Sequence, residues 1–471
     1  MKKFLVAAVA AAFLLCSTAP LSAAELSSYG FMKFVGQFTD NLGFVEEDKG
    51  TSDFALNQRA RTWFDFTASE NLKATVGLEW DSAWGNSDFD SNGAMRNAGL
   101  WLSGDRNMIE TKHLYVDFTF PGTEVDVRAG QFWVELPSNF GSSILGGDMP
   151  ALQMNAPISD AMGLTLGWTR TYDLNGGFGE TKDSPAGDDN DIFYTAMPID
   201  MDGFSFTPFG AYGLLGDGST FDSEGVGIGY PGATSLGAAG TSLAPFGDDI
   251  DAWWLGVSGD VTMMDPIAFL YDFNYGEMDG DDFETTGYVA DLAFQYRMDM
   301  LTLQVMGFYG SGDDWSDYDS SNPEGGRMPV YFTESFTPPA TLGYANCGTC
   351  TGSISDGQFS FHQAGMWSVG MSLQNITFSD KLSGDLQLRY NEGTNDKELA
   401  ENGIYLSPYN NQLTEKDSAI EIGAQVDYAL YENLTATLDA GYINLDMDED
   451  VWGQKFEEDL TRIAAGLTYS W

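Results

Sequence analysis

The sequence ends with Leu460-Thr461-Arg462-Ile463-Ala464-Ala465-Gly466-Leu467-Thr468-Tyr469-Ser470-Trp471. Successive side chains of a β-strand point to opposite faces, so Thr461, Ile463, Ala465, Leu467, Tyr469 and Trp471 would share one mostly apolar face. The other face is small or polar. Apolar-out and polar-in alternation with an aromatic residue at the edge is typical of a strand that spans an outer membrane. An ordinary half-buried strand is the alternative interpretation.

The start of the chain has the features of a secretory signal peptide. Met1-Lys2-Lys3 is basic, Phe4 to Leu15 is apolar, and Ser22-Ala23-Ala24 is a small-residue cleavage site. We therefore expect a signal peptide over residues 1–24 and one domain over residues 25–471. No later stretch has the roughly 18 consecutive apolar residues of a membrane helix.

Composition excludes some classes of protein and leaves others open. The formal net charge is −49, from 21 basic and 70 acidic residues, so no basic surface for nucleic acid is expected. Aromatic residues make up 14% of the chain, which argues against disorder. Of the three cysteines, only Cys347 and Cys350 would remain after the signal peptide is removed, and in an oxidising compartment they indicate a local disulfide. A redox or zinc role would need a helix N-terminus or a second pair of ligands.

Alternating segments of about 9 to 14 residues recur along the chain, joined in turn by a very short turn and a long acidic connection. The short turns are Ser69-Glu70-Asn71, Pro121-Gly122-Thr123, Met201-Asp202-Gly203, Met264-Asp265-Pro266, Met298-Asp299-Met300, Ser379-Asp380-Lys381 and Tyr431-Glu432-Asn433. This pattern predicts a transmembrane antiparallel β-barrel of about 16–18 strands, with periplasmic turns and long external loops. A barrel of this size leaves an aqueous channel. We expect the last strand to close the barrel by pairing with residues 26–38.

In its opening residues, Glu25-Leu26-Ser27-Ser28-Tyr29-Gly30-Phe31-Met32-Lys33-Phe34, and in its overall layout, the chain resembles Gram-negative general porins, especially the homotrimeric porins of sulfate-reducing bacteria. The resemblance implies that Leu467, Tyr469 and Trp471 are recognised by the barrel-insertion machinery, although such porins usually end in Phe. It also implies a homotrimer in the outer membrane, in contact with lipid and lipopolysaccharide. The outward residues Gln58, Ala60 and Thr62 are poor lipid contacts and favour a protein neighbour, although a monomer stays open.

The resemblance further implies that the third external loop folds into the barrel and forms a constriction opposite basic residues. Residues 133–150 are the corresponding segment, and it is compact, apolar and poor in acids. Strand parity places the side chains of Arg59, Arg61, Lys73, Asp126 and Arg128 in the lumen, because Arg at mid-membrane on the lipid face costs about 2–4 kcal/mol. We expect these residues, set against Glu135 and Asp148, to line the constriction. In the alternative interpretation the loop is an ordinary external loop, and the cations only neutralise lumen carboxylates such as Asp65, Glu79, Asp81 and Asp117.

These expectations predict passive diffusion of small hydrophilic solutes and ions through a water-filled pore, with weak cation preference and no cofactor. One alternative is a substrate-specific uptake channel, which a run of aromatic residues down the lumen would support. A secreted acidic surface protein is a more distant alternative. A membrane-embedded hydrolase would need a nucleophile and a base, and the chain has only His113 and His362. Clustered acids at 279–284 and 446–450 do not have EF-hand spacing, so no metal site is expected.

Overall fold

The computed structural model describes residues 24–40, 52–84, 109–173, 189–215, 250–280, 283–317, 324–333, 365–404, 413–453, 455 and 459–471. Residues 1–23 of the predicted signal peptide and the Cys347–Cys350 pair lie outside these residues. The strands are β1 (Glu25–Asp40), β2 (Ser52–Ser69), β3 (Leu72–Ala83), β4 (Glu110–Thr119), β5 (Asp126–Glu135), β6 (Leu145–Ser159), β7 (Met162–Asp173), β8 (Asp189–Ala196), β9 (Ile199–Met201), β10 (Phe204–Leu215), β11 (Ile250–Met264), β12 (Ile267–Gly280), β13 (Phe283–Arg297), β14 (Thr302–Gly310), β15 (Glu324–Gly325), β16 (Phe332–Thr333), β17 (Met366–Ser379), β18 (Leu382–Gly393), β19 (Ser418–Tyr431), β20 (Leu434–Asp446) and β21 (Asp459–Ser470).

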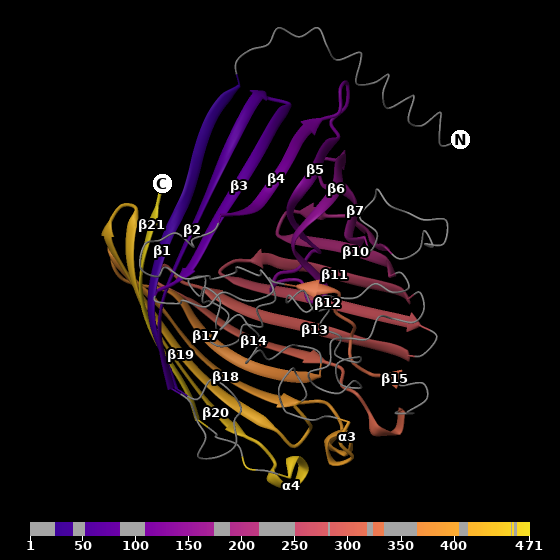
Figure 1. Ribbon diagram of the computed structural model, residues 1–471, viewed down its shortest axis with the longest axis vertical. Helices are drawn as coiled ribbons and strands as arrows, with labels where there is room; N and C mark the ends of the chain where they lie inside the picture. Colours follow the sequence, from indigo (N-terminus) through magenta and orange to yellow (C-terminus); the bar gives the residue numbers. More distant parts are fainter. Residues whose placement is uncertain are drawn as a thin grey trace.

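The strands form one closed antiparallel barrel. Each barrel strand pairs with its neighbours in the chain, and β1 also pairs with β21, from Phe31 opposite Ser470 to Asp40 opposite Thr461. In Figure 1 the indigo β1 lies beside the yellow β21. β8 and β9 count as one strand interrupted at Met197 and Pro198. β15 and β16 are not part of the wall, so the described residues give eighteen barrel strands. The predicted barrel and its closing pair are therefore confirmed.

Alternation of side chains sets the two faces of the wall. Large apolar side chains such as Phe34, Leu114, Leu255, Leu292 and Leu388 are exposed on the outer face. Polar and small side chains alternate with them on the inner face, so the outer face is suited to lipid and the inner face to water. Closure pairs β1 with β21 over residues 31–40, so the two terminal strands do not leave an open edge there, which hydrocarbon would not tolerate.

The short turns lie where the sequence pattern predicted them. All seven predicted turns join consecutive barrel strands. An eighth turn, at Asp160 and Ala161 between β6 and β7, was not predicted, although Ala161 N is held by Ser159 Oγ at 3.3 Å as in other polar turns of this barrel.

Short helices occur only beside the strand ends in the part of the chain that the structure describes. They are the 3₁₀ helix η1 (Trp315–Asp317) and the α-helices α3 (Lys397–Glu401) and α4 (Glu449–Trp452). Asp396 and Asp448 cap α3 and α4, because each carboxylate accepts a hydrogen bond from a backbone N–H of the first turn. In Figure 1 both helices lie at the end of the barrel away from the short turns. Among the described residues, no helix is long and apolar enough to cross a bilayer.

Candidate pore constriction

The third external loop, residues 136–144 between β5 and β6, reaches across the barrel to β11 and β12. Asn139 donates from Nδ2 to the carbonyl oxygens of Gly259 (2.9 Å) and Tyr271 (3.2 Å) and to Asp272 Oδ1 (3.0 Å). Asn139 N and Ser138 Oγ both donate to Asp272 Oδ2, at 2.8 and 2.6 Å. Because β7, β8 and β10 lie between β6 and β11 in the wall, these contacts carry the loop inward across three strands. The predicted inward fold of this loop is confirmed.

Apolar packing supports the same placement. Leu136, Ile144 and Leu145 at the two ends of the loop are buried in one hydrophobic cluster with Phe132 and Trp254. The cluster lies inside the barrel, on the side of β8 and β10 to β13. A loop extended into solvent would leave these side chains in water, so burying them favours the inward path.

A second segment, residues 324–333 in the connection after β14, also folds inward. Tyr331 N donates to Ile144 O (3.0 Å) and Trp254 Nε1 to Pro329 O (2.8 Å). Arg327 is fully buried and pairs with Asp313 Oδ2 at 2.8 Å. This segment was not predicted from the sequence. The available signal was the apolar run Met328-Pro329-Val330-Tyr331, which follows Arg327 within an otherwise acidic connection.

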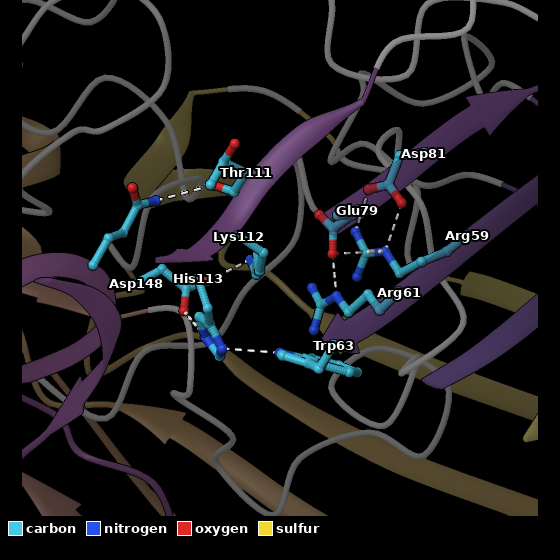
Figure 2. A network of polar contacts seen from close by, with 10 residues as sticks. Arg59, Arg61, Trp63, Glu79, Asp81, Thr111, Lys112, His113 and Asp148 are labelled. Atoms are coloured by element: carbon cyan, nitrogen blue, oxygen red, sulfur yellow. Dashed lines mark hydrogen bonds and ion pairs between the residues drawn. The ribbon is translucent and has the colours of Figure 1, made fainter. Parts of the chain in front are cut away.

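The predicted cations lie on the inner face, and each is paired with a carboxylate on a neighbouring strand. Figure 2 shows the pairs of Arg59 and Arg61. Arg59 donates from Nε and Nη2 to the two oxygens of Asp81, at 2.8 and 2.5 Å, and Arg61 pairs with Glu79. Lys73 Nζ lies 3.3 Å from Asp65 Oδ2. Arg128 donates to both oxygens of Asp117, at 2.6 and 3.1 Å. Such bidentate pairs fix the guanidinium plane against the wall.

The predicted acids make different contacts. Glu135 accepts from Trp133 Nε1 (3.0 Å) and Ser142 N (3.1 Å) and so closes the base of the loop, while Asp126 accepts from Thr119 Oγ1 (2.8 Å). The arginines therefore pair sideways within the wall rather than with Glu135 or Asp148, and the contacts match the alternative in which cations neutralise lumen carboxylates. That these residues line the constriction stays a prediction.

Asp148 lies in a chain of polar contacts with two side chains of β4. It pairs with Lys112 Nζ at 2.6 Å and with His113 Nε2 at 2.9 Å (Figure 2). Trp63 Nε1 donates to His113 Nδ1 at 2.9 Å, which assigns the imidazole proton to Nε2 and makes Asp148 its acceptor. The register of β3 against β4 shifts at Gly77, so Lys112 is an extra residue, as in a β-bulge, and turns toward the same carboxylate as His113. Simple alternation could not predict Lys112 here.

Aromatic side chains lie in a row on the inner faces of β1, β2 and β4. We call Tyr29, Phe31, Trp63, His113 and Tyr115 the aromatic track. Tyr29 stacks on Trp63 with 5.5 Å between centroids and 12° between ring planes, and Phe31 lies 6.3 Å from Trp63. Trp63 to His113 and His113 to Tyr115 are 6.1 and 5.9 Å. Successive rings are therefore in contact across neighbouring strands of this part of the wall.

The last predicted residues lie on the outer face at the closing strand. Leu467, Tyr469 and Trp471 are partly exposed there, and Tyr469 stacks on Trp471 at 5.9 Å. Their recognition by the insertion machinery stays a prediction. On the outer face of β2, Gln58 Oε1 accepts from Trp84 Nε1 at 3.0 Å, so part of its polarity is satisfied within the chain.

Comparisons with known proteins agree with this architecture. Residues 284–465 match a family model described as a porin subfamily, which covers less than half of the chain. A search of curated proteins finds no match. The fold is similar to OccAB3 of Acinetobacter baumannii, with a TM-score of 0.52 and 11% identity over 94% of this chain and 100% of that one. It is also similar to the outer membrane protein OprD of Pseudomonas aeruginosa, with a TM-score of 0.52 and 12% identity over 96% of this chain and 95% of that one.

The outer-membrane location does not favour the alternative of a secreted acidic surface protein. The resemblance to porins of sulfate-reducing bacteria in particular is not among these matches. The barrel and the family match together support an outer-membrane porin, located in the outer membrane of a Gram-negative bacterium.

Proposed function

We propose that this chain is a substrate-specific outer-membrane uptake channel, through which small hydrophilic solutes diffuse passively. The observation that carries the proposal is the pair of inward segments, residues 136–144 and 324–333, joined to each other by the bond from Tyr331 N to Ile144 O. Together they occupy the lumen beside β7 to β13 and leave the wall that carries the aromatic track as the lining of the path. A narrow path with one chemically distinct wall discriminates among solutes.

General diffusion with weak cation preference is the second candidate. It is favoured by the net charge of −49, since acidic external residues would concentrate cations at the mouth. The sideways pairing of Arg59, Arg61 and Arg128 reduces the opposing attraction for anions. The homotrimer expected from the family resemblance belongs with this proposal and is tested by crosslinking in detergent.

The experiment is a recording of the purified chain in planar bilayers. A specific channel gives small KCl conductance that candidate solutes block in a saturable way. Conductance that no solute class reduces at saturation would favour general diffusion instead. Reversal potentials in a KCl gradient measure the cation preference separately, and anion preference would contradict it.

A further inference from the structure

The aromatic track offers a flat apolar surface to the lumen. Tyr29 is 45% exposed, although its ring stacks on Trp63, so one of its faces remains open to the lumen. Trp63 reaches across β3 to His113 because residue 77 is glycine: a Cβ there would lie 2.8 Å from Trp63 Nε1. The indole therefore lies along the wall rather than standing out into the pore. This arrangement leaves the open face of Tyr29, backed by Trp63, as a platform that a flat solute can approach.

The platform is bordered by charges that cancel in pairs. Arg59 pairs with Asp81 and Arg61 with Glu79 on one side. Lys73 and Arg128 pair with Asp65 and Asp117 on the other. These four cations and four carboxylates cancel, and Lys112 pairs with Asp148 beside them, so most of the charge on this wall is paired; Lys33, above the Phe31 ring, is a further cation. Ion pairing also holds donors and acceptors in fixed directions, which favours hydrogen bonding to neutral hydroxyl groups over attraction of a charged solute.

Arg128 limits where stacking can occur. Its guanidinium carbon lies 4.5 Å above the ring centroid of Tyr115, so that face of Tyr115 is covered by a cation. Lys33 Nζ lies 5.1 Å above the Phe31 ring, and Trp63 lies between Tyr29 and the wall, so the face left for a solute is the open face of Tyr29. A stacking platform with polar groups at both edges is complementary to a ring that has apolar C–H faces and polar substituents around its edge.

We propose that the aromatic track binds neutral polyhydroxylated rings, that is, sugars, and that it selects them during passage. This inference rests on the proposed channel function and adds the class of solute. The ring of the sugar stacks on the open face of Tyr29, and Trp63 supports Tyr29 from the wall side. Its hydroxyl groups exchange hydrogen bonds with the paired side chains of Arg61 and Glu79 above and of Lys73 and Asp65 below.

The test is calorimetric titration of the full chain in detergent micelles with maltose as the probe and benzoate as a charged aromatic ring for comparison. We expect saturable maltose binding that weakens about tenfold in Trp63→Ala, because the variant removes the ring that holds Tyr29 in place and an aromatic pair contributes up to about 1.5 kcal/mol. Trp80→Ala is the matched control, because Trp80 lies on β3 next to this wall but alternates to the outer face, and it leaves the affinity unchanged. Trp63→Phe keeps a stacking ring and retains affinity within about threefold.

The outcomes separate this inference from the channel itself. The inference is overturned if maltose does not bind, if Trp63→Ala binds it as well as the unaltered chain, or if benzoate binds and maltose does not. Heat-modifiable migration on a gel verifies that each variant is folded. If the chain conducts KCl but does not bind maltose, the sugar site is refuted and the channel function stands. If it binds maltose but does not conduct ions, the channel function is refuted and the sugar site stands.

Discussion

Replacing Asp272 with alanine should weaken the attachment of the third loop to β12. The Asp272 carboxylate is 3% exposed and accepts three hydrogen bonds, from Ser138 Oγ, Asn139 N and Asn139 Nδ2. Each bond to a charged group contributes about 1.5–3 kcal/mol, but removing the carboxylate also removes the free-energy cost of burying it. We therefore expect a net loss of about 2–4 kcal/mol in the free energy that holds the loop inward.

That loss raises the population of displaced loop by about 30-fold to 1000-fold, because each 1.4 kcal/mol is a factor of ten. The loop is weakened rather than freed, since Asn139 keeps its bonds to Gly259 O and Tyr271 O. The assay is single-channel recording in KCl, where Asp272→Ala should give larger conductance and more frequent transitions between levels. Proteolysis within residues 136–144 should become faster in the same variant.

Asp427→Ala is the matched control. Asp427 also lies on the inner face, on β19, but its partners are Gln425 and Thr437, which belong to the wall. Both variants remove one negative charge from the lumen, so a purely electrostatic effect would appear in both. If Asp272→Ala leaves the conductance and the cleavage rate of the loop unchanged, or if Asp427→Ala changes them equally, the loop is not held by this carboxylate.

Three further outcomes are expected. In Gly77→Ala the new Cβ would crowd Trp63 Nε1 and displace the indole from its hydrogen bond. The free energy of unfolding in urea should fall by about 1 kcal/mol. An unaltered free energy of unfolding would contradict the close packing there. Arg59→Ala leaves Asp81 without its bidentate partner, so the reversal potential should indicate a higher cation-to-anion permeability ratio. The ratio should rise by no more than about fivefold, because a solvated ion pair contributes about 1 kcal/mol or less. A shift toward anion permeability would refute the pairing. Burial raises the pKa of Asp417, so the folded form keeps this proton to a higher pH than the unfolded form does. Local stability should therefore fall as the pH rises above about 4. Amide exchange around residues 414–417, corrected for intrinsic rates, should show this pH dependence, and Asp417→Asn should lose it.

The wall of the barrel could be predicted from the sequence because its signals are local. Alternation and turn residues act within a few positions, so the closing strand at 461–470 and the turns at 69–71 and 431–433 follow from neighbouring residues alone. The third loop was predicted as an inward segment through its place in the order of elements. Its anchor at Asp272 depends on contacts with strands more than a hundred residues away.

The partners of the lumen residues could not be predicted for a related reason. Alternation shows that Arg59 faces inward, but only the register between β2 and β3 places Asp81 opposite it. A one-residue bulge at Lys112 breaks the alternation on β4 and brings a cation to Asp148. The inward path of residues 324–333 is fixed by Trp254 and Ile144, which lie far away in the sequence.

Closure of the wall also has a consequence for assembly. Gln37 on β1 and Arg462 on β21 are hydrogen-bond partners separated by 425 positions in the chain, so the seam between these strands forms only after both ends have been made. Long-range pairings of this kind form slowly because chain entropy is lost before any contact repays it. Until the seam forms, both edge strands present unpaired backbone N–H and C=O groups, each costing several kcal/mol in hydrocarbon. Loss of either strand would therefore give an open sheet with two reactive edges, prone to pair with another chain, rather than a smaller barrel.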